Sequence, residues 1–371
     1  MRTAVSIARF FTGILFIFSG LVKAIDPKGL AYKMQEFFEA FSQSGWMPKL
    51  MHALYDHALT FSIIIITMEV IVGVALLLGW QKKVITWILL LLMLLFTFLT
   101  SYVLFSGKIR ACGCFGDCIP ITPIQTFTKD IILLILSVFL LFNLRHIRPM
   151  FKPLIQTIIM VVATGLTLYL QFYVLNHLPL FDCLPFKKGN NIIQLRQMPE
   201  NAVQDKYDYV FVYKKGNEQK EFSMTNLPDS TWEFVDRKQK LIQKGVNNIP
   251  LINDFSLTRE DGTDVTENVL NTPGEYYLIF MKELPEDFHR WESEFKKTLA
   301  GLKGQKVYVV TSQRPGVTQF IARSALPVTD ILTCDAIAIK TAARTNPTVY
   351  KMNGPVVQKK WGAADLYKVS K

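Results

Sequence analysis

Five long apolar segments constrain this 371-residue chain more than any other feature of its sequence. A helix that crosses a bilayer requires roughly 20 predominantly apolar residues. Segments of about that length all lie in the first half of the chain, at 4–25, 59–79, 84–106, 127–144 and 154–175. The first is too long for the apolar core of a signal peptide and has no clear small-residue cleavage site, so we expect it to be retained. The sequence therefore predicts an α-helical membrane bundle.

The second half of the chain has the composition of a soluble domain, and the number of spans determines on which side it lies. Two spans separate the short loop after residue 106 from the C-terminal half, so both lie on the same side of the membrane. The short turns at 81–83 and 145–148 are dense in cations, as cytoplasmic turns are. We therefore expect a multi-pass protein of the bacterial inner (cytoplasmic) membrane. Its loop and C-terminal half would lie in the extracytoplasmic compartment, where disulfides persist.

Most of the cysteines gather in one short loop. Cys112, Cys114 and Cys118 lie within seven residues, and Cys183 follows the last apolar segment. Thiol–disulfide exchange requires an exposed thiolate, a disulfide to attack and a resolving thiol nearby. A bridge between Cys112 and Cys114 would be strained and therefore easily reduced. Cys118 and Cys183 could form a second pair that passes electrons onward.

Two other interpretations of the same cysteines stay open. The disulfides could be static and only pin the loop. Alternatively, Cys112, Cys114 and Cys118 could bind a structural metal, with Cys183 or Asp117 as the fourth ligand. The loop lacks the paired two-residue spacing of a typical zinc site, so we expect no metal. Two cations early in the loop lower the pKa of nearby thiols, which favours exchange.

Glu69 lies near the middle of the second apolar segment. A carboxylate at that depth is costly, so it should face the bundle interior and is a functional candidate by default. It could bind or protonate a membrane quinone, or relay a proton; the alternative is a protonated side chain that hydrogen-bonds to a neighbouring helix. Lys23 is the nearest cation, but it lies near the end of its segment and is expected to extend outward to water. No covalently bound cofactor is expected.

Outside the spans, the sequence indicates a surface that faces lipid. Residues 32–41 are typical of an interfacial amphipathic helix on the side of the cysteine loop, with its apolar side on lipid. That side could instead cap the loop or receive a partner. The formal net charge of +11 is spread over turns, helix ends and the soluble half rather than clustered with aromatic residues. We therefore expect contact with a bilayer and no nucleic-acid partner.

The soluble half divides into two parts. Residues 181–249 are predicted to be a β-rich connecting region with a hairpin formed by 207–213 and 220–224. From residue 250 strands and helices alternate, and Asn353-Gly354 marks a second hairpin. The predicted strands are 276–281, 306–311, 347–352 and 355–361, and the predicted helices are 285–303, 317–325 and 335–344.

This order resembles a thioredoxin-like domain over residues 250–371. Asn346-Pro347-Thr348 stands where that fold keeps a cis-proline, and Asp254-Phe255-Ser256-Leu257 resembles its lead-in strand. The resemblance implies a redox dithiol directly after the first central strand, but residues 282–287 contain no cysteine. The domain is therefore expected to lack that dithiol cycle. Cys334 precedes a predicted helix, where the pKa of a thiol can be lowered; the alternative is an inert, half-buried thiol.

The first 145 residues resemble the DoxX/MauE group of small membrane proteins. The resemblance rests on Arg9-Phe10-Phe11-x-Gly13, Phe18-Ser19-Gly20-Leu21-x-Lys23, Asp26-Pro27, Glu69-x-x-x-Gly73 and Cys112-Gly113-Cys114-Phe115-Gly116. The last motif is the most specific and is similar to the MauE side of the group. That family is associated with methylamine utilisation, where the resemblance implies support of disulfide formation beside a thioredoxin-like partner. We carry over the thiol–disulfide role and not the pathway.

Two hypotheses of function follow. In the first, residues 1–180, with the cysteine loop at 107–123, form a membrane thiol–disulfide oxidoreductase or electron conduit. It would support disulfide formation in extracytoplasmic clients, with Cys112, Cys114, Cys118, Cys183 and Glu69 as the reactive residues and a membrane quinone as electron acceptor. In the second, the protein is a non-catalytic membrane scaffold or assembly factor, and its degenerate thioredoxin-like domain binds a partner protein.

Overall fold

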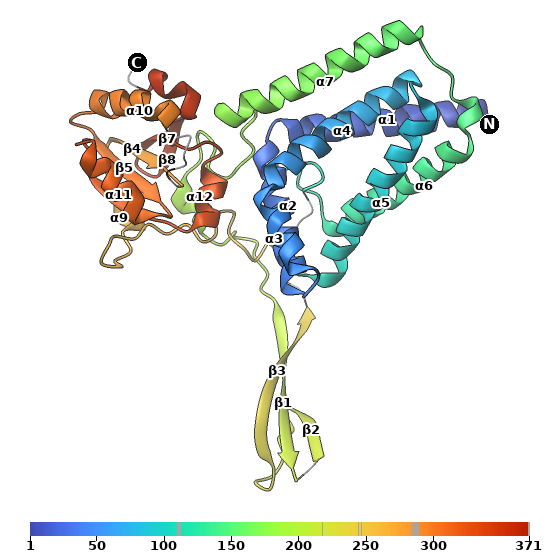
Figure 1. Cartoon of the computed structure of the whole chain (residues 1–371). Coiled ribbons are helices and arrows are strands. Elements are labelled where there is room, and N and C mark those ends of the chain that lie inside the picture. The colour runs from blue at the N-terminus through green and yellow to red at the C-terminus, as the bar shows by residue number, and fades with distance from the viewer. Residues whose placement is uncertain are drawn as a thin grey trace.

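The protein consists of a helical bundle, a projecting three-stranded sheet and a C-terminal α/β domain (Figure 1). The computed structural model describes residues 1–109, 113–216, 218–243, 245, 247–282, 284 and 289–369. Cys112 therefore lies outside the described residues, as does most of the segment after Met281 in which the sequence lacks a dithiol.

Five helices in the described part of the chain are long and apolar enough to cross a membrane. They are α1 (Arg2–Ala24), α4 (Ala58–Leu78), α5 (Lys82–Ser106), α6 (Pro123–Phe142) and α7 (Pro153–Asn176). Large apolar side chains such as Leu91 and Ile135 stay 61% and 63% exposed on their outer surfaces, as lipid-facing residues do. The predicted membrane bundle is confirmed. A short 3₁₀ turn, η1 (Leu144–His146), lies between α6 and α7.

Glycines allow α1 and α4 to approach each other closely. A Cβ atom added to Gly20 would lie 2.6 Å from a methyl group of Val70, and one added to Gly73 would lie 2.8 Å from the carbonyl oxygen of Gly13. Small residues are the usual way in which membrane helices bring their backbones together. The contact places the polar side chains of α1 directly against those of α4.

Two shorter helices, α2 (Pro27–Gln43) and α3 (Pro48–Asp56), connect α1 to α4. Asp26 caps α2 by accepting a hydrogen bond of 3.1 Å from the backbone N–H of Gly29. The apolar side of α2 packs on α5, since Phe41 is buried and its ring centroid lies 4.8 Å from that of Tyr102. The expectation that this apolar side lies on lipid is wrong for these residues, because α5 offers an aromatic surface that covers it.

The connecting region forms an antiparallel sheet in the order β2-β1-β3. Its strands are β1 (Lys206–Lys215), β2 (Glu218–Ser223) and β3 (Glu233–Gln243), and a short helix, α8 (Ile192–Arg196), precedes them. The predicted hairpin is confirmed, although Asn217 of its turn lies outside the described residues. The third strand was not predicted. The sheet projects away from both the bundle and the α/β domain (Figure 1).

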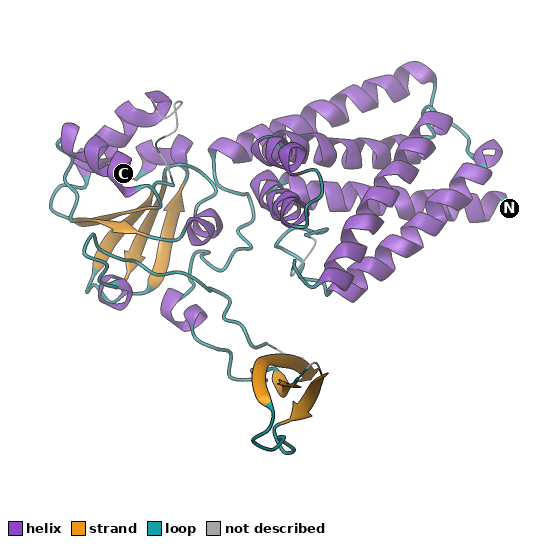
Figure 2. Cartoon of the chain, turned by 60° about the horizontal axis from the view of Figure 1, so that its bottom comes forward, coloured by secondary structure: helices purple, strands orange, loops and turns teal. Residues whose placement is uncertain are grey.

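The C-terminal domain is built on a five-stranded sheet in the order β6-β5-β4-β7-β8. The strands β4 (Glu275–Phe280), β5 (Lys306–Thr311) and β6 (Asp330–Thr333) are parallel to one another. The strand β7 (Thr348–Asn353) is antiparallel to β4, and β8 (Val356–Trp361) is antiparallel to β7. Helices lie on both sides of this sheet (Figure 2), and they are α9 (Thr266–Leu270), α10 (His289–Gly301), α11 (Arg314–Arg323), α12 (Ala336–Ala342) and the 3₁₀ helix η3 (Ala363–Lys368).

Most of the predicted elements of this domain are present. The Asn346–Pro347 peptide bond is cis, at the position that the sequence indicated. The predicted lead-in strand at 254–257 does not form; only the next residue, Thr258, makes isolated bridges, to Thr333 and Asp264. The four-residue strand β6 was missed because it is short and only one of its residues is fully buried.

Candidate functional site

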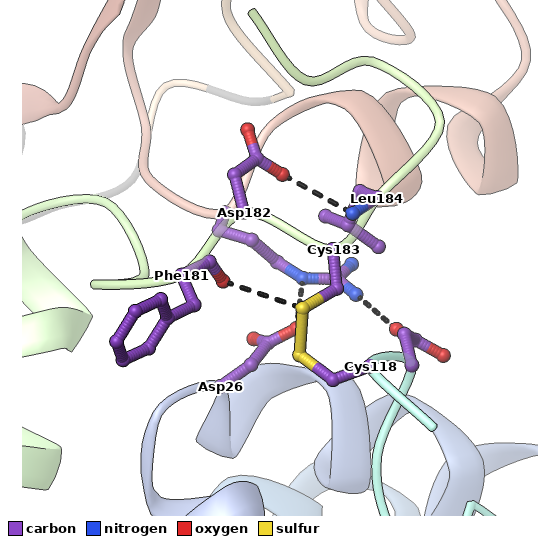
Figure 3. Close-up of a disulfide and its surroundings, with 8 residues drawn as sticks. Asp26, Cys118, Phe181, Asp182, Cys183 and Leu184 are labelled. Carbon is purple, nitrogen blue, oxygen red and sulfur yellow. Dashed lines mark hydrogen bonds and ion pairs between the residues drawn. A yellow bond between two sulfur atoms is a disulfide. The ribbon is translucent and has the colours of Figure 1, made fainter. Parts of the chain in front are cut away.

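A disulfide joins Cys118 of the loop to Cys183 of the segment after α7 (Figure 3). The pair was one of those that the sequence left open. The two cysteines are 65 residues apart, and α6 and α7 lie between them. The bond requires the loop and the chain after α7 to lie at the same end of the bundle, as an even number of intervening spans predicts.

Each cysteine of the disulfide follows an aspartate that pairs with a cation of the α/β domain. Asp117 lies 2.9 Å from a guanidinium nitrogen of Arg344, which follows α12. Asp182 lies 2.7 Å from the ammonium of Lys360 on β8. Arg344 also reaches Asp26 at 2.8 Å, and Figure 3 shows Asp26 beside the disulfide. Ion pairs thus hold the α/β domain to the two residues that immediately precede the cysteines of the disulfide.

Burial affects the two cations differently. Burial alone would lower the pKa of Arg344, but the carboxylates of Asp26 and Asp117 outweigh it and the pKa is raised. Burial lowers the pKa of Lys360, and the attraction of Asp182 offsets this only in part. The guanidinium of Arg344 also lies 5.4 Å from the ring centroid of Tyr32, within cation–π range. Arg344 is therefore the more firmly charged of the two contacts.

A cavity of about 760 Å³ lies beside the disulfide, between α2, the cysteine loop and α12. Both cysteines line it, together with Tyr32, Lys340 and Arg344. Ligand sites in proteins span roughly 300–1,000 Å³, so the cavity is large enough for several side chains of another molecule. Cys118 and Cys183 are both partly exposed, so the disulfide forms part of the wall of this cavity.

Glu69 is buried inside the bundle and pairs with Lys23. The ammonium of Lys23 lies 2.6 and 2.7 Å from the two carboxylate oxygens, and the two side chains are only 5% and 4% exposed. The expectation that Lys23 extends outward to water is wrong. The close approach of α1 to α4 turns Lys23 toward the carboxylate, and the ring of Phe96 lies 5.3 Å from the ammonium.

Ser19 connects this ion pair to the cysteine loop. Its hydroxyl lies 2.9 Å from Glu69 Oε1 and 3.0 Å from the backbone oxygen of Cys114, and it accepts a hydrogen bond of 3.0 Å from Lys23. Sequence reasoning missed Ser19, although it lies one helical turn before Lys23 and on the same face. A continuous polar contact thus runs from Glu69 to the loop.

Lys129 and Asp130, at the start of α6, complete the charged cluster. Their side chains lie 2.9 Å apart, and the carboxylate of Asp130 is fully buried. The ammonium of Lys129 lies 4.9 Å from the ring centroid of Phe115, and it also interacts electrostatically with Cys114 and Glu69. Both residues lie within the predicted fourth span and were missed, although adjacent charges inside an apolar segment are a visible signal.

The remaining candidate residues behave in different ways. Cys114 is buried at 8% exposure, and its backbone oxygen lies 3.0 Å from the hydroxyl of Ser19. The structural-metal interpretation is weakened, since Cys118 and Cys183 form a disulfide and a disulfide offers no thiolate ligands. Burial raises the pKa of the Cys334 thiol to about 12, which agrees with the inert thiol rather than with the lowered pKa among the two interpretations of the sequence. Cys334 is 4% exposed and its thiol is protonated at neutral pH.

Comparison with known proteins agrees with the N-terminal part of this structure. Residues 1–143 match the family described as methylamine utilisation protein MauE, and residues 207–244 match a domain of unknown function, DUF8463. Protein TlpB from Flavobacterium psychrophilum is 42% identical over 87 residues, which are 23% of this chain and 24% of that protein. The chain thus matches about a quarter of the length of this curated relative. No solved structure matches. The N-terminal part is a MauE-like membrane bundle.

Proposed function

We propose that the protein is a membrane thiol–disulfide oxidoreductase that accepts electrons from extracytoplasmic clients. The observation that carries the proposal is the Cys118–Cys183 disulfide on the wall of the 760 Å³ cavity. A structural staple needs no access for another molecule, whereas exchange requires an accessible sulfur. The match of residues 1–143 to the MauE family supports a thiol-related role in a membrane. The cavity and the α/β domain would face the extracytoplasmic side of the bacterial inner membrane.

The reaction begins when a client thiolate attacks one sulfur of the Cys118–Cys183 disulfide. The S–S bond breaks, the attacked cysteine forms a mixed disulfide with the client, and the other cysteine leaves as a thiolate. A second client thiol then attacks the mixed disulfide. The client leaves with a new disulfide, and the protein retains two thiols and the two electrons that the client has lost. Lys340, which also lines the cavity, contributes positive charge to its wall, and positive charge stabilises a thiolate.

The buried cluster around Glu69 supplies groups for proton movement during re-oxidation. Glu69, Lys23 and Ser19 form a connected hydrogen-bonded set, and Ser19 also contacts the backbone of Cys114. A membrane quinone, when bound, would supply the acceptor for two electrons and two protons. A lipid-facing hollow of about 350 Å³ between α1 and α6 fits such a group, with Phe11 and Leu15 as apolar walls and Lys129 as a polar contact.

The α/β domain over residues 250–371 is proposed to be a thioredoxin-like domain that positions the disulfide and does not carry a dithiol. The strand order β6-β5-β4-β7-β8 and the cis peptide before Pro347 support this assignment. Its cations at positions 344 and 360 hold the aspartates that precede the two cysteines. In this division, residues 1–180 form the catalytic bundle, and residues 181–249 connect it to the positioning domain.

The test is to trap the redox state of the cysteines in membranes with acid and to read it by maleimide mass shift. In a Cys183→Ser variant the free Cys118 thiolate attacks the disulfide of an oxidised client, and the client's other cysteine leaves as a thiolate. Cys183 is no longer present to resolve this mixed disulfide, so the client attached to Cys118 can be identified. The matched control is Cys334→Ser, which removes a buried thiol that does not line the cavity and should capture nothing. A Cys118–Cys183 bond that stays oxidised in growing cells, with no captured client, would eliminate the oxidoreductase.

A scaffold role is the second candidate, and the ion pairs of Arg344 favour it. They fix the α/β domain to the bundle independently of any exchange. A scaffold would retain its partner protein when Cys118 and Cys183 are both replaced by serine, whereas an oxidoreductase would lose its mixed disulfides. This double variant therefore separates the two functions.

A further inference from the structure

The projecting sheet is aromatic on one face. Phe211 and Tyr213 on β1 lie opposite Phe222 on β2 and Phe234 on β3. The ring centroids of Tyr213 and Phe234 are 5.7 Å apart, and those of Phe222 and Trp232 are 5.3 Å apart. Alternate residues of a strand point to one face, so Tyr207 and Tyr209 continue this aromatic surface along β1. These rings are the aromatic face of the sheet.

The opposite face is polar. Val210 and Val212 of β1 lie there between the charged side chains of the neighbouring strands. Lys238 of β3 and Glu221 of β2 cross this face as an ion pair of 2.7 Å. The sheet is therefore amphipathic. An antiparallel sheet with one apolar and one polar face usually covers another apolar surface with the first and faces water with the second.

The aromatic face has no extensive cover in the described part of the chain. The strands of the sheet pack on one another, and none of the described helices of the bundle or of the α/β domain packs extensively on them. Phe234 remains 58% exposed and Tyr207 44% exposed. An aromatic surface of this extent is costly in water, which indicates an occupant.

The position of the sheet identifies that occupant. In Figure 1 the sheet continues below α2 and α3, across the direction of α1 and α4, at the end of the bundle where the cysteine loop lies. It does not extend outward with the α/β domain, and in Figure 2 it also projects away from that domain. The sheet thus lies level with the end of the bundle at which the cysteine loop lies, where the boundary of the membrane is expected.

We propose that the aromatic face of the sheet binds the headgroup region of the bilayer leaflet on the cysteine-loop side. Tyrosine and tryptophan concentrate at this depth because their rings are apolar and their tips are polar. Arg237 lies 5.2 Å from the ring of Tyr209, and Lys220 lies 5.8 Å from the ring of Trp232. These cations stand among the rings, where lipid phosphates would accept their hydrogen bonds. The sheet therefore anchors the connecting region along the membrane surface.

The test places a photoreactive benzoylphenylalanine at position 234 of the full-length protein in nanodiscs of phosphatidylethanolamine and phosphatidylglycerol. The matched control carries it at position 238, on the same strand but on the polar face. Illumination should attach phospholipid at 234 and not at 238, as read by mass spectrometry of the peptides. Position 207 serves as a second site on the aromatic face if the 234 variant does not form the Cys118–Cys183 disulfide. Adducts to another protein or to a second copy, or no lipid adduct from either aromatic position, would overturn the proposal.

Discussion

Arg344, which follows α12, lies 2.9 Å from Asp117, the residue directly before Cys118. The same guanidinium reaches Asp26 between α1 and α2 at 2.8 Å, so one side chain joins the α/β domain to two separate segments of the bundle. Arg344, which makes both contacts, is only 5% exposed. The geometry of the disulfide region therefore depends on a residue more than 200 positions later in the chain.

Arg344→Met should loosen the α/β domain from the cysteine loop. The change leaves Asp26 and Asp117 without their counter-charge. Because these side chains are 21% and 41% exposed, we expect a cost below the roughly 3–5 kcal/mol of a fully buried ion pair. We expect a lower melting temperature and faster reduction of Cys118–Cys183 by a mild reductant, both measured on purified protein. The control is Arg259→Met, whose ion pair with Asp330 is half exposed and should contribute no more than about 1 kcal/mol. Equal effects of the two variants would contradict the special role of Arg344.

Lys23→Met and Glu69→Gln should each destabilise the bundle more than the two changes combined. Either single change leaves one group buried without its partner, which costs about 3–5 kcal/mol, whereas the double change removes both charges. The measurement is a double-mutant cycle of unfolding free energies in detergent. A double variant that recovers stability but no longer re-oxidises its cysteines would separate the folding role of the pair from its proposed role in proton movement. Additive losses would show that the two side chains do not interact.

Gly20→Ala should force α1 and α4 apart, because the added methyl group would lie 2.6 Å from Val70. Overpacking of this kind costs about 1–3 kcal/mol. The control is Gly165→Ala in α7, where an added methyl group meets no atom within 4 Å and stability should be unchanged or slightly raised. Thermal unfolding of both variants in nanodiscs makes the comparison. If both glycine variants were as stable as the parent protein, the close approach would not determine the packing of these helices.

Cys334 should make the protein less stable in alkali. Its folded pKa of about 12 lies above the value of 9.0 for an unperturbed thiol. The folded state therefore keeps its proton where the unfolded state has lost it, so the contribution to stability is full below pH 9 and is lost as the pH rises toward 12. The difference in stability between the parent protein and Cys334→Ala should narrow over that interval. The thiol should also resist maleimide until the protein is unfolded, and rapid labelling of folded protein would contradict its burial.

Local patterns in the sequence predicted the helices and hairpins better than they predicted the contacts between side chains of different elements. The five spans could be read because each depends on the composition of one continuous segment. Both hairpins could be read because their turn residues are neighbours in sequence. The pairing of Lys23 with Glu69 could not be predicted, because it depends on how closely α1 and α4 approach each other. Glycines allow this approach, and nothing in the pattern of one helix shows which glycines of another helix it will contact. The partners of Arg344 were hidden for the same reason, since no periodicity within α12 refers to Asp26 or Asp117.

The disulfide between Cys118 and Cys183 also changes the connectivity of the molecule. It closes the chain into a covalent ring that contains α6 and α7, and the α/β domain follows from the point of closure. A single cut by a protease between residues 119 and 182 would therefore leave the protein in one piece until a reductant is added. Each transfer of electrons to this bond would open the ring, so the protein would alternate between a cyclic and a linear covalent form.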